Sequence, residues 1–362
     1  MGSKGISTVI ATILVLTITI ALAGTAYLYI SGVFTSKVVT SFSIIDSFND
    51  SVTIRNSGTE PITKITATLD GNPVNTIFDL NNNLVGYWKM NEGEGTQTKD
   101  SSGKENNGVL NGGGLWVGGK YNKAIQFNGV DSYVEVPDSN SLDVTREITI
   151  AAWINLKELT GNADQDMILN KEGIPYEIAV HDNTGPDDGI HTCGKSTDQI
   201  PPYNFAFYLG GVSGLPNHNC GWKDGGGPVP TNIWTHVAVT YDGSVVRTFI
   251  NGIMQKEYTG VSGLIDTRDT AVRIGARGSP APATQANQGA LFNGVIDEVM
   301  IYNKGLPKGG IEALYLANGE IALEPGQAMI IKPITTDPLS KGTHTLRLCT
   351  SSMCNTAILT IT

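Results

Sequence analysis

Charged side chains are scarce in this chain, and those present are mostly acidic. Lys and Arg number 24 and Asp and Glu number 34, so charged residues make up 16% of the 362 positions and the formal net charge is −10. An average soluble protein carries about 25% charged residues. Because nucleic-acid partners select basic patches, we expect no nucleic-acid partner. Acidic character in an exposed domain favours solubility and attracts cations.

Short sequence signatures of several enzyme classes are also missing. The chain has no Gly-x-Ser-x-Gly motif, no phosphate-binding loop and no dinucleotide fingerprint. These absences exclude the best-marked hydrolase, nucleotidase and dehydrogenase sites. We therefore expect a protein that is not an enzyme.

Cysteine is limited to four residues, which fall into two pairs. Cys349 and Cys354 flank a short stretch that a hairpin turn can close, and disulfides persist outside the cell, so we predict a disulfide between them. Cys193 and Cys220 each follow a His by two positions. A second disulfide is the favoured state of this pair. A zinc site built from the two Cys and two His, and free thiols, are the alternatives.

The longest uncharged segment lies at the N-terminus. Residues 6–34 contain no charge over 29 positions and follow a short basic leader, residues 1–5. As a helix this run would be about 43 Å long, more than the ~30 Å hydrocarbon core of a bilayer. It is longer than the apolar region of a signal peptide, and its many Thr, Ala and Gly residues favour close helix packing. A cleaved signal, a membrane anchor and a pilin-type helix are the three interpretations.

The same segment resembles the N-terminus of archaeal type IV pilins, in the stretches KGISTVIATIL (residues 4–14) and YLYISG (residues 27–32). The resemblance implies cleavage by a prepilin peptidase between Gly5 and Ile6, and an apolar helix over residues 6–35. It also implies two kinds of partner, copies of the same chain in a helical homopolymer and the pilus assembly machinery. The chain would be inserted in the membrane before assembly and would end in an extracellular surface filament.

Downstream of the apolar run, the two flanks of the chain alternate apolar and polar residues in strand-like runs. The flanks, residues 36–83 and 318–362, are each about 45 residues long and too small for a good core alone. Together they predict about seven strands, an immunoglobulin-like sandwich. They resemble the head of archaeal pilins in SVTIRNSGTEPITKITATLDGNPV, IALEPGQAMIIKPI and GTHTLRLCTSSMCNTAILTIT. This head carries the single N-glycosylation sequon, Asn49-Asp50-Ser51.

Residues 84–317, between the flanks, are richer in Trp, Tyr and Gly and form a predicted insertion into the head. Strand-like alternation at residues 234–241 and the turns Asp242-Gly243 and Asn251-Gly252 indicate antiparallel hairpins. The insertion resembles the laminin-G-like, concanavalin-A-like jelly roll. The resemblance rests on VGYWKMNEG (85–93), AIQFNGVDSYV (124–134), ITIAAWI (148–154), WTHVAVTYDG (234–243), FING (249–252) and FNGVIDEVMIYN (292–303).

The predicted fold class is therefore mainly β with one long N-terminal hydrophobic α-helix. In this prediction, the small immunoglobulin-like sandwich is interrupted by the jelly roll.

The jelly-roll resemblance also implies a structural calcium ion. Its ligands would be Asp131 and Asp297, with Asn128 as a carbonyl-type ligand, and oxygen ligands of this kind suit calcium. In the alternative interpretation, both Asp side chains cap turns by accepting hydrogen bonds from backbone amides.

A loop-rich excursion within the insertion, residues 181–230, is the expected place for ligand contact. Exposed aromatic rings can stack on sugars and carboxylates can accept hydrogen bonds from hydroxyl groups. The candidate contacts are Asp187, Asp188, Tyr203, Trp222 and Asp224. In the alternative interpretation, the loop folds on itself under Trp222.

The expected function is a structural subunit of a pilus-like surface filament that displays the jelly roll for adhesion to glycans or proteins. The first alternative is a membrane-anchored adhesin or minor pilin that does not polymerise in bulk. A glucanase-type enzyme is a more distant alternative because it needs two nearby carboxylates. The Glu-x-Asp-x-x-Glu strand motif of such enzymes is absent, and adjacent Asp297 and Glu298 are expected on opposite faces of a strand.

Overall fold

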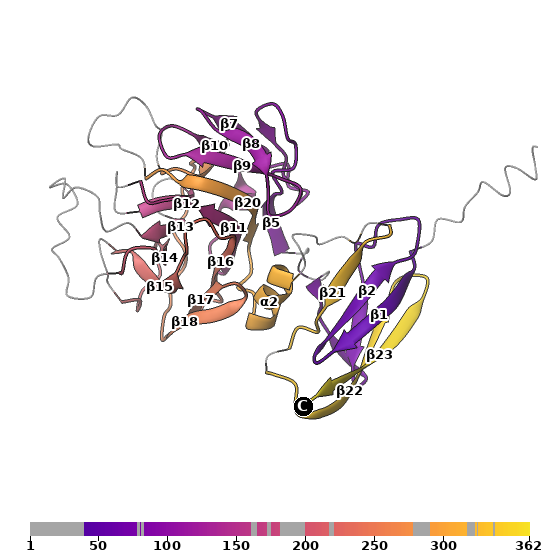
Figure 1. The fold of residues 1–362 in the computed structure, drawn as a ribbon. Coiled ribbons are helices and arrows are strands. Elements are labelled where there is room, and N and C mark those ends of the chain that lie inside the picture. The colour runs from indigo at the N-terminus through magenta and orange to yellow at the C-terminus, as the bar shows by residue number, and fades with distance from the viewer. Residues whose placement is uncertain are drawn as a thin grey trace, which may run out of the picture.

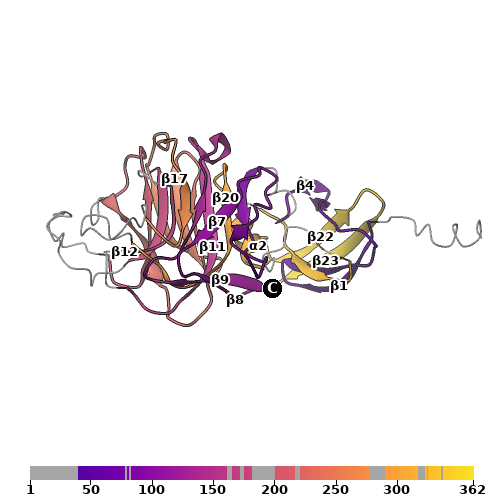
Figure 2. The ribbon, with the colours of Figure 1, turned by 90° about the horizontal axis from the view of Figure 1, so that it is seen from above.

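The structure is a computed structural model of the 362-residue chain. It describes residues 40–77, 80, 83–160, 165–171, 175–181, 200–216, 221–277, 290–316, 323, 325–335 and 337–362. Two β bodies and one α-helix make up this part of the chain, and in both views the helix lies between the bodies (Figures 1 and 2).

The larger body is the jelly roll, which consists of two antiparallel sheets. The first sheet has the strand order β15-β14-β13-β12-β19-β10-β7-β6, and the second has the order β18-β17-β16-β11-β20-β9-β8, with β5 also pairing with β20. The strands of the first sheet are β6 (Gln97–Thr98), β7 (Gly108–Asn111), β10 (Tyr133–Val136), β12 (Gln165–Lys171), β13 (Tyr176–His181), β14 (Asn204–Leu209), β15 (Lys223–Pro228) and β19 (Val272–Ile274). Those of the second are β5 (Leu84–Trp88), β8 (Leu115–Gly118), β9 (Lys123–Asn128), β11 (Ile148–Leu156), β16 (Thr235–Tyr241), β17 (Val245–Ile250), β18 (Ile253–Thr259) and β20 (Asn293–Tyr302).

The core of the jelly roll lies between these two sheets. On the regular central strands, alternate residues project into it, as the period of two in an extended chain requires. On β13 these are Tyr176, Ile178 and Val180, and on β11 they include Ile150 and Ile154. The short 3-10 helix η2 (Asn140–Leu142) buries Leu142 in the same core.

The smaller body is the head, a sandwich built from both ends of the chain. One sheet has the order β1-β2-β21 and the other β23-β22-β3-β4. Its strands are β1 (Phe42–Phe48), β2 (Ser51–Asn56), β3 (Thr66–Leu69), β4 (Asn72–Val74), β21 (Ala328–Ile331), β22 (Gly342–Cys349) and β23 (Cys354–Ile361). Strand β2 pairs with β21 and β3 pairs with β22, so each sheet joins residues from before and after the jelly roll.

The helix α2 (Lys308–Leu316) links the jelly roll to the head. Its buried residues Ile311, Ala313 and Leu314 belong to a second apolar core. That core also contains side chains of the head and one row of residues of the second jelly-roll sheet. Each residue of this row pairs with the next on the neighbouring strand. The row is Tyr87, Met300, Ala151, Ala238 and Phe249. The two bodies therefore share an apolar core.

The predicted fold class was wrong in one part, the long apolar helix. Within the described ranges the only α-helix is α2, nine residues long, and no described helix is long and apolar enough to cross a membrane. The stretch predicted as that helix, residues 6–35, lies outside the described residues. The prediction rested on an uncharged run and on a resemblance to pilins, and neither of these by itself fixes a backbone conformation. The strongly β pattern after residue 40 gives the described chain its class.

Candidate functional site

The outer face of the first jelly-roll sheet carries polar side chains that are buried. Strand β13 shows why: Tyr176, Ile178 and Val180 face the core, so Glu177, Ala179 and His181 face outward. All six residues are buried. The same alternation on β14 places Phe205 and Phe207 in the core and leaves Ala206 and Tyr208 on the outer face.

Five polar side chains form one row across this face. Tyr208 pairs with Glu177, Glu177 with Asn170, Asn170 with Arg273, and Arg273 with Glu135. Residues directly opposite each other in antiparallel strands project to the same side of the sheet. The row therefore runs across β14, β13, β12, β19 and β10. We call these five residues the polar row.

Glu177 is the most perturbed member of the polar row. Its side chain is fully buried, and burial raises the pKa of its carboxyl group, although the positive charge of Arg277 and hydrogen bonds from Asn170 and Arg277 act in the opposite direction. Arg277 Nε lies 3.1 Å from Oε1, and the amide of Asn170 donates to the same oxygen. The second oxygen, Oε2, has no hydrogen-bond partner among the described residues. A buried acceptor of this kind is costly unless a ligand or water supplies a donor.

At the other end of the polar row, Arg273 is held by Glu135. Its Nε and Nη2 lie 3.1 and 3.0 Å from Glu135 Oε2. The guanidinium carbon also lies 5.9 Å from the centre of the Tyr133 ring. These contacts fix the direction of the Arg273 donors, because a guanidinium group is planar and rigid.

An apolar cluster lies beside the polar row on the same face. Arg277 lies 5.9 Å from the centre of the Trp222 ring, and Tyr208 meets Trp222 edge-on at 6.3 Å. The cluster consists of Met167, Ala179, Ile200, Ala206, Trp222 and Ala290, with Tyr208 packed against it. The face thus combines fixed donors and acceptors with a buried apolar cluster, against which Tyr208 packs.

The ligands predicted for calcium are not brought together. Asp131 Oδ1 accepts hydrogen bonds from Gly113 N and from the Asn128 amide, while Asn128 Oδ1 accepts from the amides of Val130 and Asp131. Asp297 lies one residue beyond the Ile296–Ile125 pair, at the far end of β9 from Asn128. Four residues of strand separate these positions by roughly 13 Å. The geometry is that of a turn at Asn128–Asp131, and these residues do not fit one calcium ion.

One cluster of three acidic side chains with metal-like spacing occurs within the described ranges: Asp138, Asp143 and Asp269. The fully buried Lys171 lies against it, with Nζ 3.0 Å from both Asp138 Oδ1 and Asp143 Oδ1. Thr270 O accepts a third contact from Nζ, at 3.2 Å. An ammonium group therefore already supplies a positive charge to this cluster.

The predicted ligand-contact loop is only partly described. Trp222 lies on the polar face next to Arg277, but its side chain is buried and is not the exposed ring that was expected. Asp224, on β15, accepts from Asn204 and Gly226 N and pairs with Lys256 at 3.1 Å, and these bonds lower the pKa of its carboxyl group against the effect of burial. Tyr203 is partly exposed in a left-handed turn conformation. Asp187 and Asp188 lie outside the described residues.

The remaining predicted positions fall as follows. Cys349 and Cys354 are joined by a disulfide. Asn49 is exposed in the turn between β1 and β2. The predicted cleavage point, Gly5 and Ile6, and the pair Cys193 and Cys220 lie outside the described residues.

Sequence reasoning missed Glu177, Asn170, Arg273, Glu135 and Arg277. A signal for Glu177 was present, because it stands between the apolar residues Tyr176 and Ile178 in a run with strand alternation. The row itself was not visible, since it depends on the register of five strands. That register includes a bulge in β12 between Met167 and Leu169.

A family model matches residues 127–311, just over half of the chain; it is the laminin G type model described as the concanavalin A-like lectin/glucanases superfamily. The chain belongs to this superfamily. The jelly roll predicted from the sequence is thereby confirmed. No curated protein matches the sequence.

Several solved structures are similar to this lectin/glucanase-superfamily chain. Domain 4 of AbnA, a GH43 extracellular arabinanase from Geobacillus stearothermophilus in complex with arabinotriose, is 20% identical at a TM-score of 0.45, over 64% of this chain and 98% of that one. The binding domain of Paraclostridial Mosquitocidal Protein 1 is 18% identical at a TM-score of 0.47, over 66% and 52%. Trypanosoma rangeli sialidase in complex with the inhibitor DANA is 17% identical at 0.44, over 69% and 34%. The chain thus spans nearly all of the first structure, about half of the second and about a third of the third.

Proposed function

We propose that the jelly roll is a non-catalytic binding module for glycans, presented at the cell surface by the head. The observation that carries this proposal is the polar row beside the apolar cluster of Trp222. A sugar ring has hydroxyl groups around its edge and an apolar face, so it needs fixed donors and acceptors next to an apolar platform. Ligand sites of this composition are common in proteins.

The spacing of the carboxylates supports binding over hydrolysis. Glycosidases place their two carboxyl groups about 5–5.5 Å or about 6.5–9.5 Å apart. In the polar row, Glu177 and Glu135 are separated by three strand spacings, roughly 14 Å. Glu135 is also engaged by Arg273. This pair is therefore too far apart for either mechanism.

Binding of the whole chain to an array of glycans, followed by calorimetric titration of the glycans retained, tests this function. Glu177→Gln removes the charge of the acceptor and should weaken binding by roughly tenfold or more, as expected for a hydrogen bond to a charged group. Trp222→Ala should weaken it as well, because the buried Trp222 ring packs against Tyr208 and Arg277 and holds them in place. Near-ultraviolet circular dichroism checks that each variant is folded.

Glu257→Gln is the matched control, because Glu257 pairs with Arg247 at 2.7 Å on β18, in the other sheet. It should bind like the unaltered chain. An array with no retained glycan, or equal losses in Glu177→Gln and Glu257→Gln, would refute the proposed site. Release of sugar from a bound oligosaccharide would show that the jelly roll is an enzyme and not a non-catalytic binding module.

A pilus-like surface subunit is the second candidate function, and the split head favours it. Because β2 pairs with β21 and β3 with β22, the head closes on itself and carries the jelly roll as an insertion. Such an arrangement suits a repeating subunit that displays a binding module. Electron microscopy of surface filaments labelled with antibodies against the jelly roll tests it. Label along filaments supports the subunit, and label confined to the cell envelope supports the anchored adhesin.

A further inference from the structure

The β1–β2 hairpin of the head ends in a two-residue turn. Phe48 pairs with Ser51, which leaves Asn49 and Asp50 at the tip. Asn49 has a φ of 51°, a left-handed conformation that Asn adopts more readily than most residues. Its side chain is exposed and makes no hydrogen bond to the described residues.

The neighbouring Asp50 is held in a different way. Lys332 Nζ lies 2.8 Å from Asp50 Oδ2 and 2.6 Å from Glu312 Oε1, so it bridges the hairpin tip to α2. These hydrogen bonds raise the pKa of Lys332 although burial lowers it. The bridge fixes the tip of the hairpin and leaves Asn49 as its free amide.

The tip also exposes a large apolar side chain. Phe48, directly before Asn49, is 72% exposed, more than any other large apolar residue in the described chain. An aromatic ring at this position would gain from being covered, since removal of apolar surface from water is favourable.

We propose that Asn49 carries an N-linked glycan whose first sugar covers Phe48. Asn49-Asp50-Ser51 is the only Asn-x-Ser/Thr sequence in the chain without Pro at the middle position. The donor is a sugar chain carried on a polyprenyl phosphate or diphosphate. The Asn49 amide nitrogen forms a bond to C1 of the first sugar, the C1–O bond to the phosphate breaks, the phosphate leaves with the bonding electrons, and the amide nitrogen loses one proton.

This inference rests on the surface location in the proposed function, and it concerns the head and not the polar face. Mass spectrometry of the mature chain recovered from its producing cells tests it directly. The peptide that contains Asn49 should carry the mass of a glycan. Asn49→Gln and Ser51→Ala should lose that mass, whereas Ser51→Thr should keep it because the sequon survives. An unmodified Asn49 peptide from the unaltered chain overturns the proposal.

The contact with Phe48 has its own test in a second pair of variants. Removal of the glycan by Asn49→Gln should lower the melting temperature by about 2–4 °C, the shift expected for a contact of this kind in a domain this large. In a Phe48→Ala background the same removal should have little effect. Equal shifts in both backgrounds overturn the contact. If the array retains no glycan but the Asn49 peptide carries one, only the proposed function of the jelly roll is refuted.

Discussion

At the scale of single residues, two buried carboxyl groups show how environment sets chemistry. Glu177 lies on the outer face of the first sheet with Arg277 and Asn170. Asp297 is fully buried in the middle of β20, where Oδ2 accepts from Tyr121 N at 3.1 Å and Oδ1 has no hydrogen-bond partner among the described residues. Burial raises the pKa of Asp297 to about 7, against the effect of hydrogen bonds from the backbone.

Asp297 should therefore make stability depend on pH in a defined direction. Its folded-state pKa of about 7 exceeds its ordinary value of 3.8, so between these values the folded chain binds more protons than the unfolded chain. The contribution of Asp297 is fully present below about pH 4 and is lost as the pH rises towards 7. Relative to Asp297→Asn, the unaltered chain should lose about 1 kcal/mol of unfolding free energy per pH unit in this window.

Urea unfolding of both proteins between pH 4 and 7.5 measures this difference. Burial lowers the pKa of His236 to about 3, because the neutral form is favoured in the folded chain. His236 therefore makes the unfolding free energy rise with pH. This contribution is the same in both proteins and cancels in the comparison. Parallel stability curves would mean that Asp297 does not titrate in this range.

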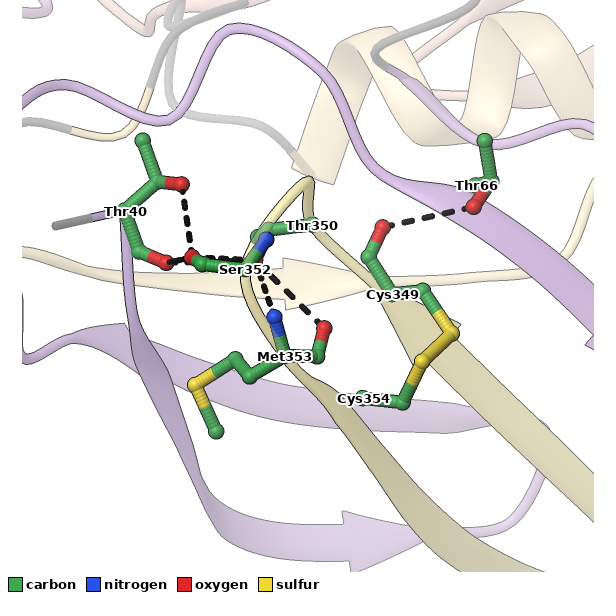
Figure 3. Close-up of a disulfide and its surroundings, with 7 residues drawn as sticks. All are labelled: Thr40, Thr66, Cys349, Thr350, Ser352, Met353 and Cys354. Atoms are coloured by element: carbon green, nitrogen blue, oxygen red, sulfur yellow. Dashed lines mark hydrogen bonds between the residues drawn. A yellow bond between two sulfur atoms is a disulfide. The ribbon is translucent and has the colours of Figure 1, made fainter.

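At the scale of elements, the hairpin of β22 and β23 holds the first described residues of the chain. The disulfide closes this hairpin, since Cys349 pairs directly with Cys354 across the two strands. In the tip, Thr350 Oγ1 and Ser352 Oγ both donate to Thr40 O, as Figure 3 shows for the region around Thr40. Thr66 Oγ1 donates to Cys349 O at 3.4 Å. The hairpin therefore connects β3 on one side with the start of β1 on the other.

Replacement of both cysteines by serine should destabilise the head by about 2 kcal/mol, because a short closed loop removes only a modest amount of entropy from the unfolded chain. Denaturant unfolding of the oxidised chain and the double Ser variant measures this. Hydrogen exchange of the double Ser variant, compared with the oxidised chain, should be accelerated for amides around Thr40 and β1 more than for amides in the jelly roll. Unchanged exchange around Thr40 and β1 would contradict this role of the disulfide.

At the scale of the whole molecule, the head and the jelly roll share one apolar core. The row of Tyr87, Met300, Ala151, Ala238 and Phe249 contributes to the same cluster as head residues such as Ile54 and Leu346, with α2 between them. Tyr315 of α2 also stacks on Trp153 of β11, with ring centres 5.5 Å apart. Removal of either body would expose this surface to water.

We therefore expect the two bodies to unfold together. Calorimetry of the full chain should show one cooperative transition, because separation of the bodies would expose several large apolar side chains at about 25 cal/mol per Å². A spliced head that lacks residues 84–317, and the excised residues 84–317, should each melt at a lower temperature than the full chain. Two transitions in the full chain, at the temperatures of the separate pieces, would show that the bodies are energetically independent.

By itself the sequence determined the mainly β class, the jelly roll and the approximate strands of the head. Local alternation and turn residues specify these features, because a strand shows its period of two wherever one face is buried. Runs such as His344–Leu348 and Asn355–Ile361 lie inside β22 and β23. Residues 62–69 alternate in the same way, but β3 covers only Thr66–Leu69, and Ile62 makes an isolated bridge with Leu323.

Only the tertiary structure decided which residues meet. The polar row of Tyr208, Glu177, Asn170, Arg273 and Glu135 joins positions from 135 to 273 through strand register, and a shift of one residue would turn each side chain to the other face. The same dependence separated Asp131 from Asp297, although both lie in recognisable motifs. Chemical type is a property of each residue alone, whereas distance between residues far apart in the chain is set by the packing of the whole fold.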